Sequence, residues 1–522
     1  MMQQLYDDYN NDYDYSSNIP DECLSIIFQT LSSGDRKRCS LVSRRWYTVE
    51  GQNRHRVALN SAAEITPFIP SLFTRFDSIT KLSLQCDRKS ASIDDNSLGI
   101  ISLRCVNLTR LKLRGCRDVS DVGMGVLGRN CRVLRKFSCG SCMFGAKGMN
   151  ALLNNCVTLE ELSVKRLRGL SDSDGCGASC EGSGGGGGLE LIGTDMVCGN
   201  LKGVYLKELY NGQSFGPVLV GSRNLRSLRL FSCLGEWDLV LRSVCDGRES
   251  LSEIRLEKLK VSDAGLEAIA KCVNLDTLHL MKVVEYTDEG LAMVARSCRL
   301  IRKLHIDGWR NRRMTNRIGD VGLTAVAKNG GNLMELVLIG LNPSIGSLAW
   351  ISMCCTKLER LAICASDTIG DRELECLAIK TASLKKVCIK GCRLLTNNGI
   401  ISLATFCPNL VKIKVKKCKR VTGEVVSYVK EKRPLLELSL DVNGIEVDGG
   451  DVRTADGEVR VVAGGEGPTA VAGTNDDAAQ AESSNTATLW SGLRSRISLF
   501  GGNLVTSTVR RWSSGDENQN NN

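Results

Sequence analysis

The sequence has few aromatic residues, prolines and histidines, and it lacks long apolar runs. Aromatic residues make up 5% of its 522 positions, and there are 8 prolines and 3 histidines. No run of 18 apolar residues occurs, so we expect no membrane-spanning helix and no membrane partner. Such a low aromatic content suits a thin core made of many stacked units.

A secretory leader is also lacking. The first residues, MMQQLYDDYNNDYDYSS, are acidic and contain no apolar stretch, so we expect no signal peptide. Their composition predicts that residues 1–18 are disordered. The chain nevertheless has 24 cysteines, and many thiols without a leader indicate a reducing compartment. We therefore expect the protein in the nucleus, the cytoplasm or both.

The sequence does contain a repeat, which is clearest between residues 384 and 410. Leu384, Val387 and Ile389 follow the pattern L-x-x-L-x-L, whose alternation predicts a short strand. Ile400 and Leu403 then belong to an apolar stripe at helical spacing. One such unit cannot bury both of its apolar faces, so copies are expected.

Fourteen copies of the strand pattern occur, and ten of the thirteen gaps between them are 24 to 26 residues long. This period and pattern match the leucine-rich repeat. The predicted fold class is therefore α/β, a horseshoe solenoid over residues 79–440 with parallel strands inside and helices outside. The copies begin at Ile79, Leu108, Leu134, Leu159, Leu201, Leu225, Leu251, Leu275, Ile301, Leu333, Leu358, Leu384, Leu410 and Leu435.

The cysteines follow the same period. Thirteen occupy two repeat positions, three residues before a strand start or eight after one, where a small buried side chain fits. Cys139 and Cys142 form a CxxC pair, but both lie within repeat strands or turns, so core packing is favoured over redox or zinc chemistry. Cys176 and Cys180 have no second pair at zinc spacing. We expect no metal and no cofactor.

The net charge of +10 is unevenly distributed. Residues 1–18 and 441–522 are acidic, which leaves +20 for the middle of the chain. A basic solenoid suits nucleic acid or an acidic protein, whereas a solvated convex face is the more common explanation. The run RNRRMTNR at 310–317 is a solvated loop, a nuclear-import patch or an anion site. We expect no nucleic-acid partner.

Before the repeats, residues 19–60 predict a small helical module. Pro20 and the acids after it suit a first helical turn, and apolar residues recur at helical spacing up to Trp46. A module this small needs a partner or must pack on the repeats. Residues 61–78 contain Pro67, Phe68 and Phe73, and this apolar content predicts a rigid joint.

Residues 19–46 resemble the F-box. The family pattern is present as Ile19-Pro20-Asp21-Glu22, Asp35-Arg36 and Val42-Ser43-Arg44-Arg45-Trp46, although Arg36-Lys37-Arg38 is more basic than usual. With the cysteine-containing repeats, the chain resembles F-box/leucine-rich-repeat proteins, and more narrowly the plant VIER F-box group. The adaptor-binding residues that the resemblance implies are Ile19, Pro20, Leu24, Ile27, Phe28, Leu31, Val42 and Trp46.

The resemblance implies a non-catalytic, substrate-recognition subunit of an SCF-type E3 ubiquitin ligase. The F-box would bind a Skp-type adaptor and through it a cullin. The repeats would bind an unknown target protein for ubiquitination and proteasomal degradation. The alternatives are a repeat scaffold without ligase function and a small-molecule co-receptor. No nucleophile–base pair or nucleotide loop stands apart from the repeats, so we expect no catalytic residues.

Two segments interrupt or follow the repeats. A glycine-rich insert at 169–197 lacks the Gly-Lys-Ser/Thr of a phosphate loop and predicts a surface loop. Residues 441–522 predict a mostly disordered tail. Within it, 489–500 is amphipathic and suits a partner-binding or membrane-surface helix, or a cover for the last repeat.

Alternation along the strands predicts which side chains face a target. Residues two, four and six positions after each strand start point to the concave face. Cations and apolar side chains gather there in the middle of the array, which suits an acidic or phosphorylated peptide. The predicted target-binding residues are Tyr205, Arg229, Phe231, Arg255, His279, Met281 and His305.

Overall fold

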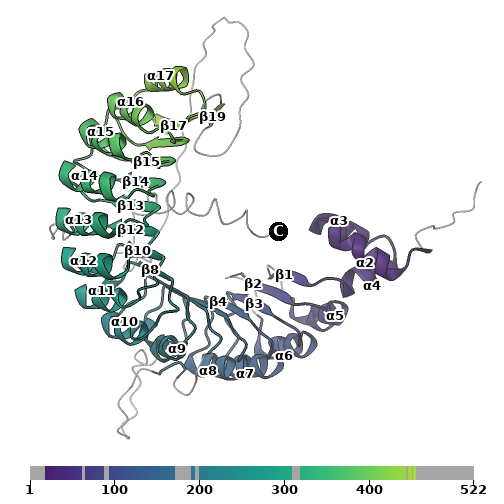
Figure 1. Cartoon of the computed structure of the whole chain (residues 1–522). Coiled ribbons are helices and arrows are strands. Elements are labelled where there is room, and N and C mark those ends of the chain that lie inside the picture. Colours follow the sequence, from purple (N-terminus) through teal and green to yellow (C-terminus); the bar gives the residue numbers. More distant parts are fainter. Residues whose placement is uncertain are drawn as a thin grey trace, which may run out of the picture. The chain divides into compact units, whose positions relative to one another are not determined.

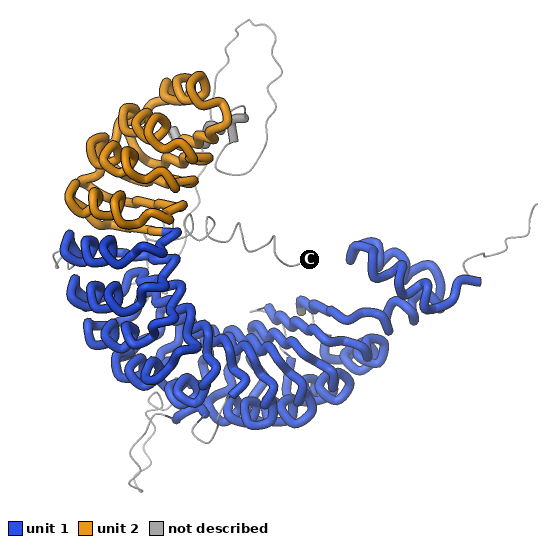
Figure 2. Tube along the Cα trace, viewed as in Figure 1, with its two compact units in different colours: residues 1–335 blue, residues 336–522 orange. Residues whose placement is uncertain are grey.

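The computed structural model divides into two units, residues 1–335 and residues 336–522 (Figure 2). The structure does not describe residues 1–17 of the predicted N-terminal segment 1–18, most of the insert at 169–197, or the amphipathic segment 489–500. The described residues are 18–61, 65–87, 93–170, 190–193, 199–308, 318–442, 445–448 and 451–453.

Unit 1 begins with a helical module and a short connection to the repeats. Ser32 and Ser43 each precede a helix and accept a hydrogen bond from a backbone N–H of its first turn, which fixes where the helix begins. The elements in order are α2 (Asp21–Thr30), α3 (Ser33–Cys39), α4 (Arg44–Gln52), β1 (Arg56–Ser61), η3 (Thr66–Phe68) and α5 (Ile69–Arg75).

The rest of unit 1 alternates strands and helices (Figure 1). Its strands are β2 (Lys81–Cys86), β3 (Arg110–Arg114), β4 (Lys136–Gly140), β5 (Glu161–Lys165), β6 (Gly203–Lys207), β7 (Ser227–Phe231), β8 (Glu253–Glu257), β9 (Lys260–Val261), β10 (Thr277–Met281), β11 (Val284–Glu285) and β12 (Lys303–Asp307). Its helices are α6 (Asp95–Arg104), α7 (Asp121–Asn130), α8 (Ala146–Asn155), η4 (Gly212–Phe215), α9 (Gly216–Gly221), α10 (Asp238–Cys245), α11 (Asp263–Ala270), α12 (Asp288–Ser297) and α13 (Asp320–Asn329).

Strands β1 to β8, β10 and β12 pair in parallel, each with the next, and equivalent repeat positions align. The helices lie along one face of these strands (Figure 1), and we call the other face the open face. Each predicted copy is followed, two residues after its start, by a strand. The predicted α/β solenoid of parallel strands and helices is therefore confirmed.

One strand was not predicted. Residues 56–60 were assigned to the end of the helical module and Ser61 to the joint, but residues 56–61 form β1, which pairs in parallel with β2. Val57 of β1 is buried. The sequence here lacks the full L-x-x-L-x-L pattern because β1 is the first strand and has a neighbouring repeat on one side only.

In unit 2, strands β14 to β17 also pair in parallel. Strand β13 (Glu335–Ile339) starts at the last residue of unit 1. The remaining elements are α14 (Ile345–Cys354), β14 (Arg360–Cys364), α15 (Asp371–Lys380), β15 (Lys386–Lys390), α16 (Asn397–Phe406), β16 (Lys412–Lys416), α17 (Glu424–Lys432), β17 (Glu437–Val442), β18 (Ile445–Asp448) and β19 (Asp451–Arg453).

The prediction for the start of the tail is corrected by the structure. Residues 441–453 were expected to be irregular, but β18 pairs antiparallel with β17, and β19 pairs antiparallel with β18. The sequence alternates apolar and polar residues only briefly here, at Ile445, Val447 and Val452. Strands this short are stabilised by the neighbour on which they pair, and local sequence patterns report such pairing poorly.

The repeat cysteines are part of the core, as predicted. Twelve of the thirteen lie in the described residues, and all twelve are buried; Cys198 lies outside them. Burial raises the pKa of Cys142 to about 11 and that of Cys139 well above its ordinary value. Because the reactive form of cysteine is the thiolate, these thiols are suited to packing and poorly suited to redox chemistry.

A carboxylate links successive helices. Asp263, in the first turn of α11, accepts hydrogen bonds from the backbone N–H groups of Thr287 (2.7 Å) and Gly290 (3.2 Å) and from the Thr287 hydroxyl (2.7 Å) at the start of α12. A Cβ on Gly290 would lie 2.3 Å from Oδ1 of this carboxylate, so only glycine leaves room for it. The same arrangement joins Asp371 to α16.

Asp263→Ala should lower the free energy of unfolding by about 1–3 kcal/mol, because it leaves three donors at the start of α12 without their acceptor. Asp246→Ala is the control, since Asp246 forms only a surface ion pair with Lys271 and its loss should change stability by under about 1 kcal/mol. Urea denaturation of both variants measures the difference. Equal midpoints would contradict a structural role for the carboxylate.

Candidate adaptor- and target-binding sites

The helical module is held together by a small core of its own. Leu24 and Phe28 of α2 are 1% and 0% exposed and pack with Val49 of α4. The Phe28 and Trp46 rings meet edge to face, with centroids 5.4 Å apart. Leu24 and Phe28 were predicted to contact an adaptor, and this is corrected: they are interior side chains that support the module surface.

Other predicted residues do reach the surface of the module. Ile27 is 44% exposed and Val42 is 63% exposed. Ile26 (63%) and Leu41 (85%) are exposed as well, and sequence reasoning missed them. Ile26 lies off the helical stripe that was used to select α2 residues, and Leu41 lies between α3 and α4. Exposed aliphatic side chains on so small a module are typical of an interaction surface.

The remaining predicted adaptor residues lie at the edges of the module. Pro20 is exposed directly before α2, whereas Ile19, Leu31 and Trp46 are partly buried against the core. Arg45 fixes the entry of the chain by pairing with Asp21 (2.7 Å) and donating to the backbone carbonyl of Ile19. The Ile-Pro-Asp start is thereby held against α4.

A buried carboxylate ties the module to the first repeat. Glu50 of α4 is fully buried and is surrounded by three arginines, one from α3, one from α5 and one from the segment after α4. Arg75 of α5 donates to it at 2.9 Å, Arg36 of α3 lies 3.5 Å from it, and Arg54 also pairs with it. The chain packs tightly here, since a Cβ on Gly51 would lie 2.7 Å from the Arg75 side chain. The connection between the module and the repeats is therefore stabilised by ion pairs of Glu50 as well as by apolar packing.

Glu50→Gln should weaken this connection strongly, because three mostly buried guanidinium groups would lose their counter-charge. Breaking a buried pair typically costs about 3–5 kcal/mol. The expected result is faster amide hydrogen exchange in α4 and α5. Glu22→Gln, at an exposed carboxyl of α2, should leave exchange unchanged. The interpretation would be wrong if the two variants exchanged alike.

Five of the predicted target-binding residues form one row across the open face of unit 1. The strand register pairs Tyr205 with Arg229, Arg229 with Arg255, Arg255 with His279, and His279 with His305. Sequence reasoning thus placed this row correctly, because equivalent repeat positions align in a parallel stack.

The charge of this row differs from the expectation. Glu253, two positions before Arg255 on β8, pairs with Arg229 at 2.8 Å and also with Arg255. The carboxyl is largely buried, and hydrogen bonds from Ser227 and Arg229 outweigh burial and lower its pKa. One carboxylate therefore holds both arginines in place, and their positive charge is partly balanced. Sequence reasoning missed Glu253 because it lies two residues after its strand start, whereas the predicted residues were taken four and six residues after.

The two histidines are stacked and do not act as cations at neutral pH. The rings of His279 and His305 lie parallel with centroids 3.6 Å apart, and Nε2 of His305 is 2.8 Å from Oε1 of Glu335. Both are buried, and burial lowers the pKa of His279 well below its ordinary value and lowers that of His305. The predicted surface of cations mixed with apolar side chains therefore has its positive charge on Arg229 and Arg255. Met281 is also buried, at 8% exposure.

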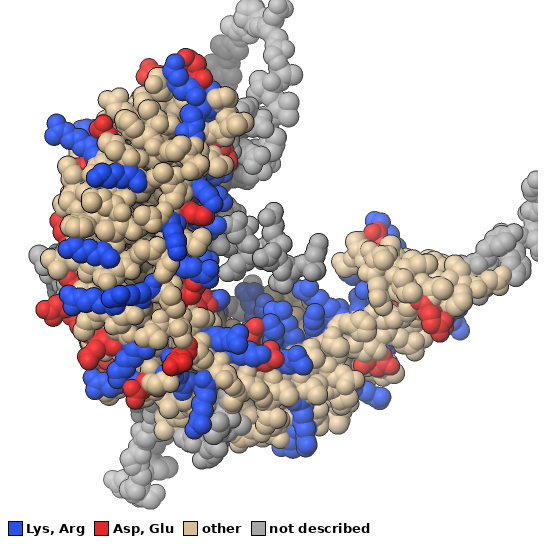
Figure 3. Space-filling model, viewed as in Figure 1, with Lys and Arg blue, Asp and Glu red and all other residues tan. Residues whose placement is uncertain are grey.

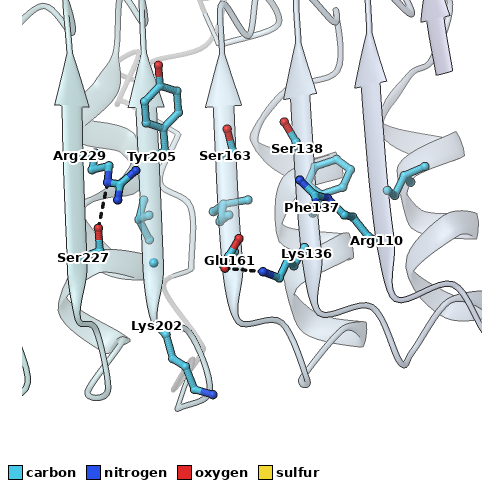
Figure 4. Close-up of a pocket in the computed structure, with 14 residues that line it drawn as sticks. Arg110, Lys136, Phe137, Ser138, Glu161, Ser163, Lys202, Tyr205, Ser227 and Arg229 are labelled. Carbon is cyan, nitrogen blue, oxygen red and sulfur yellow. Dashed lines mark hydrogen bonds and ion pairs between the residues drawn. The ribbon is translucent and has the colours of Figure 1, made fainter. Parts of the chain in front are cut away.

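A hollow of about 360 Å³ lies on the open face over β3 to β7 (Figure 4). It forms where side chains are small: Ser138, Ser163 and Gly203 occupy positions that carry long side chains on other strands. Figure 4 shows Tyr205 and Arg229 on one side of it and the Lys136–Glu161 pair (2.7 Å) on the other. The hollow can accept a side chain of a bound protein between aromatic and charged groups.

The Tyr205 ring at the edge of this hollow lies beside a second aromatic side chain. Its centroid lies 5.1 Å from that of Phe231 on β7. Phe231 was predicted as an apolar neighbour of the row, and the structure places it there. Paired aromatic rings beside partly buried arginines are typical of binding hot spots.

Within the described ranges, no group of three or more His, Cys, Asp or Glu side chains is arranged to hold a metal ion. Among the described helices, none is long and apolar enough to cross a bilayer.

Known proteins resemble the chain in its F-box segment and over its repeats. The F-box domain family model matches residues 16–55, which include α2 to α4. A transport inhibitor response 1-like protein from Oryza sativa subsp. japonica is 20% identical over 457 residues, covering 76% of this chain and 79% of that protein. F-box protein SKIP17 of Arabidopsis thaliana is 25% identical over 235 residues, covering 45% of this chain and 42% of that protein.

Two solved structures are similar in part. An internalin from Listeria monocytogenes has a TM-score of 0.43 and 16% identity, covering 76% of this chain and 93% of its own. A chain of the yeast Rad7 and Elc1 complex has a TM-score of 0.43 and 14% identity, covering 75% and 92%. The narrower likeness to the VIER F-box group stays a prediction. The chain carries an F-box domain ahead of a leucine-rich-repeat array, so its predicted resemblance to F-box/leucine-rich-repeat proteins is confirmed.

Proposed function

We propose that this chain is the substrate-recognition subunit of an SCF-type E3 ubiquitin ligase. Its F-box binds a Skp-type adaptor and through it a cullin, and its repeats bind a target protein. The chain itself performs no bond chemistry, and it acts by raising the concentration of the target near an enzyme held elsewhere in the assembly. The proposed outcome is ubiquitination and proteasomal degradation of the target, in the nucleus, the cytoplasm or both.

The observation that carries this proposal is the F-box itself. The family model matches residues 16–55, and the three helices there expose aliphatic side chains that the module cannot bury. Burying one such side chain in a partner contributes about 1.5–3 kcal/mol. Glu50 and its arginines support the next step, because they fix the adaptor-binding module against the repeat that follows.

The open face of unit 1 supports target binding. Tyr205 and Phe231 provide apolar contact area, and Arg229 and Arg255 are held ready by Glu253. Held arginines lose little side-chain entropy when they bind, which favours recognition of a carboxylate or phosphate. The hollow beside Tyr205 would seat one side chain of the target.

Replacing Leu41 and Val42 together by Ser should weaken binding of a purified Skp-type adaptor by about 100-fold, because two aliphatic contacts are lost. Both side chains are exposed, so the fold should be preserved. Val122→Ser, at an exposed residue of α7, is the matched control and should bind normally. Isothermal titration measures the affinities. Normal binding by the double variant would show that this surface does not bind the adaptor.

Arg229→Glu with Arg255→Glu should abolish capture of the target and preserve adaptor binding. Tyr205→Ala should reduce capture without disturbing the Glu253 ion pairs, and Arg226→Glu, at an exposed site directly before β7 and three residues from Arg229, should have no effect. Affinity capture with the proteasome inhibited, followed by mass spectrometry, identifies the proteins lost. The proposed face is wrong if all three variants capture the same proteins.

The two alternatives make different predictions. A repeat scaffold without ligase function would bind its partner normally and would bind no Skp-type adaptor. A small-molecule co-receptor would capture its target only in the presence of a ligand, and the hollow over β3 to β7 is large enough for a small one. Capture from dialysed extract separates the co-receptor from the direct binding that we propose.

A further inference from the structure

A group of cations lies on the open face of unit 1, on the first strands after the helical module. Buried apolar residues alternate along β1 to β4, and the residues between them point to the open face. On β1 to β3 these residues include five cations and no acid, and Lys and Arg side chains gather over these strands in Figure 3. We call the five residues the cation face: Arg56, Lys81, Arg110, Lys112 and Arg114.

The first three of these cations continue a row across neighbouring strands. The register places Arg56 beside Lys81, Lys81 beside Arg110, and Arg110 beside Lys136 of β4. Neighbouring strands lie about 4.8 Å apart, and like charges directly opposite each other are destabilising. The row is therefore repulsive in the free protein, and an anionic partner would relieve this repulsion.

The charges of the cation face are not balanced within the part of the chain that the structure describes. All five side chains are exposed, and none of them forms an ion pair or a side-chain hydrogen bond with a described residue. Lys136, at the end of the row, differs because it pairs with Glu161 at 2.7 Å. The cation face is thus accessible to a negative group from outside.

The open face farther along unit 1 has a different balance of charge. There, Glu253 holds both Arg229 and Arg255. The strands of the cation face carry no such acid at their open-face positions. The two regions therefore differ in what they can attract, and the cation face suits several negative charges together.

The cation face borders the hollow over β3 to β7. Arg110 lines that hollow together with Lys136 (Figure 4). From Arg110 the row continues over Lys81 to Arg56, a distance of about 10 Å at the usual strand spacing. An extended peptide covers about 3.3–3.6 Å per residue, so about three residues span this distance. A segment with one side chain in the hollow would place its next residues over the cation face.

We propose that the cation face binds a run of acidic residues in the target protein, directly beside the residue that enters the hollow. Arginine and lysine recognise carboxylates through charge-assisted hydrogen bonds, which are stronger than those between neutral groups. This inference rests on the proposed function and narrows it. The class of target segment is one anchor residue followed by three or more acids.

A fluorescent peptide in which one leucine precedes six aspartates is the probe. Its leucine can contact the Tyr205 ring, and fluorescence anisotropy with the purified full chain measures its affinity. The triple variant Lys81→Gln, Arg110→Gln, Lys112→Gln should bind it about tenfold more weakly, because each exposed ion pair contributes up to about fivefold. Raising the salt from 0.1 to 0.5 M should weaken binding by the unmodified chain and change binding by the variant less.

The matched control is the triple variant Arg104→Gln, Lys147→Gln, Arg242→Gln. It removes the same charge from exposed positions on α6, α8 and α10, and it should bind the peptide as the unmodified chain does. Equal affinities of the two triple variants would overturn the proposal.

Two further measurements separate a peptide-binding face from other roles. The variant of the cation face should unfold at no lower urea concentration than the unmodified chain, because repelling charges are removed. A lower midpoint would assign these residues to the fold and overturn the proposal. Tighter binding of a single-stranded oligonucleotide of eight thymidines than of the peptide would overturn it as well. None of these measurements includes an adaptor, so failure of the ligase role would leave their results unchanged.

Discussion

Many of the described repeats depend on a carboxylate that belongs to a neighbouring repeat. The first turn of a helix has N–H groups without partners inside the helix, and burying them unpaired is costly. Asp121, Asp263 and Asp371 each satisfy such groups at the start of the following helix. The contact that stacks two repeats thus also satisfies the N–H groups at the start of a helix. A single repeat alone would lose both its apolar contacts and the acceptor for these N–H groups.

The places where this link changes are informative. Asn397 replaces the aspartate in α16 and still accepts the N–H of Thr422 at 2.9 Å. Around α14, which has no acid in its first turn, Asn342 accepts the N–H of Asp367 at 2.9 Å in a neighbouring turn. At α8 the position is Ala146, and the glycine-rich insert lies between this repeat and the next described strand. The chain therefore tolerates a missing carboxylate where another polar group acts nearby or where the spacing itself changes.

Much of the fold followed from the sequence because repetition multiplies weak signals. The alternation around Leu384 and Val387 is ambiguous alone, but its copies at a constant period gave the strands, the buried cysteines and the row from Tyr205 to His305. What the sequence did not give depends on neighbours in space. The sharing of Glu253 by two arginines, the stacking of His279 on His305 and the burial of Leu24 each involve several elements, and no local pattern reports them.

Under the proposed function, two parts of unit 1 bind different partners. The helical module exposes aliphatic side chains, which we propose bind an adaptor, and the open face exposes arginines and aromatic rings, which we propose bind a target. Glu50 and its arginines join the module to the repeats. The most direct test is equilibrium association of the purified full chain with a purified Skp-type adaptor, followed by light scattering. The account predicts a stable complex of one chain with one adaptor. Two separate species at micromolar concentration would contradict it.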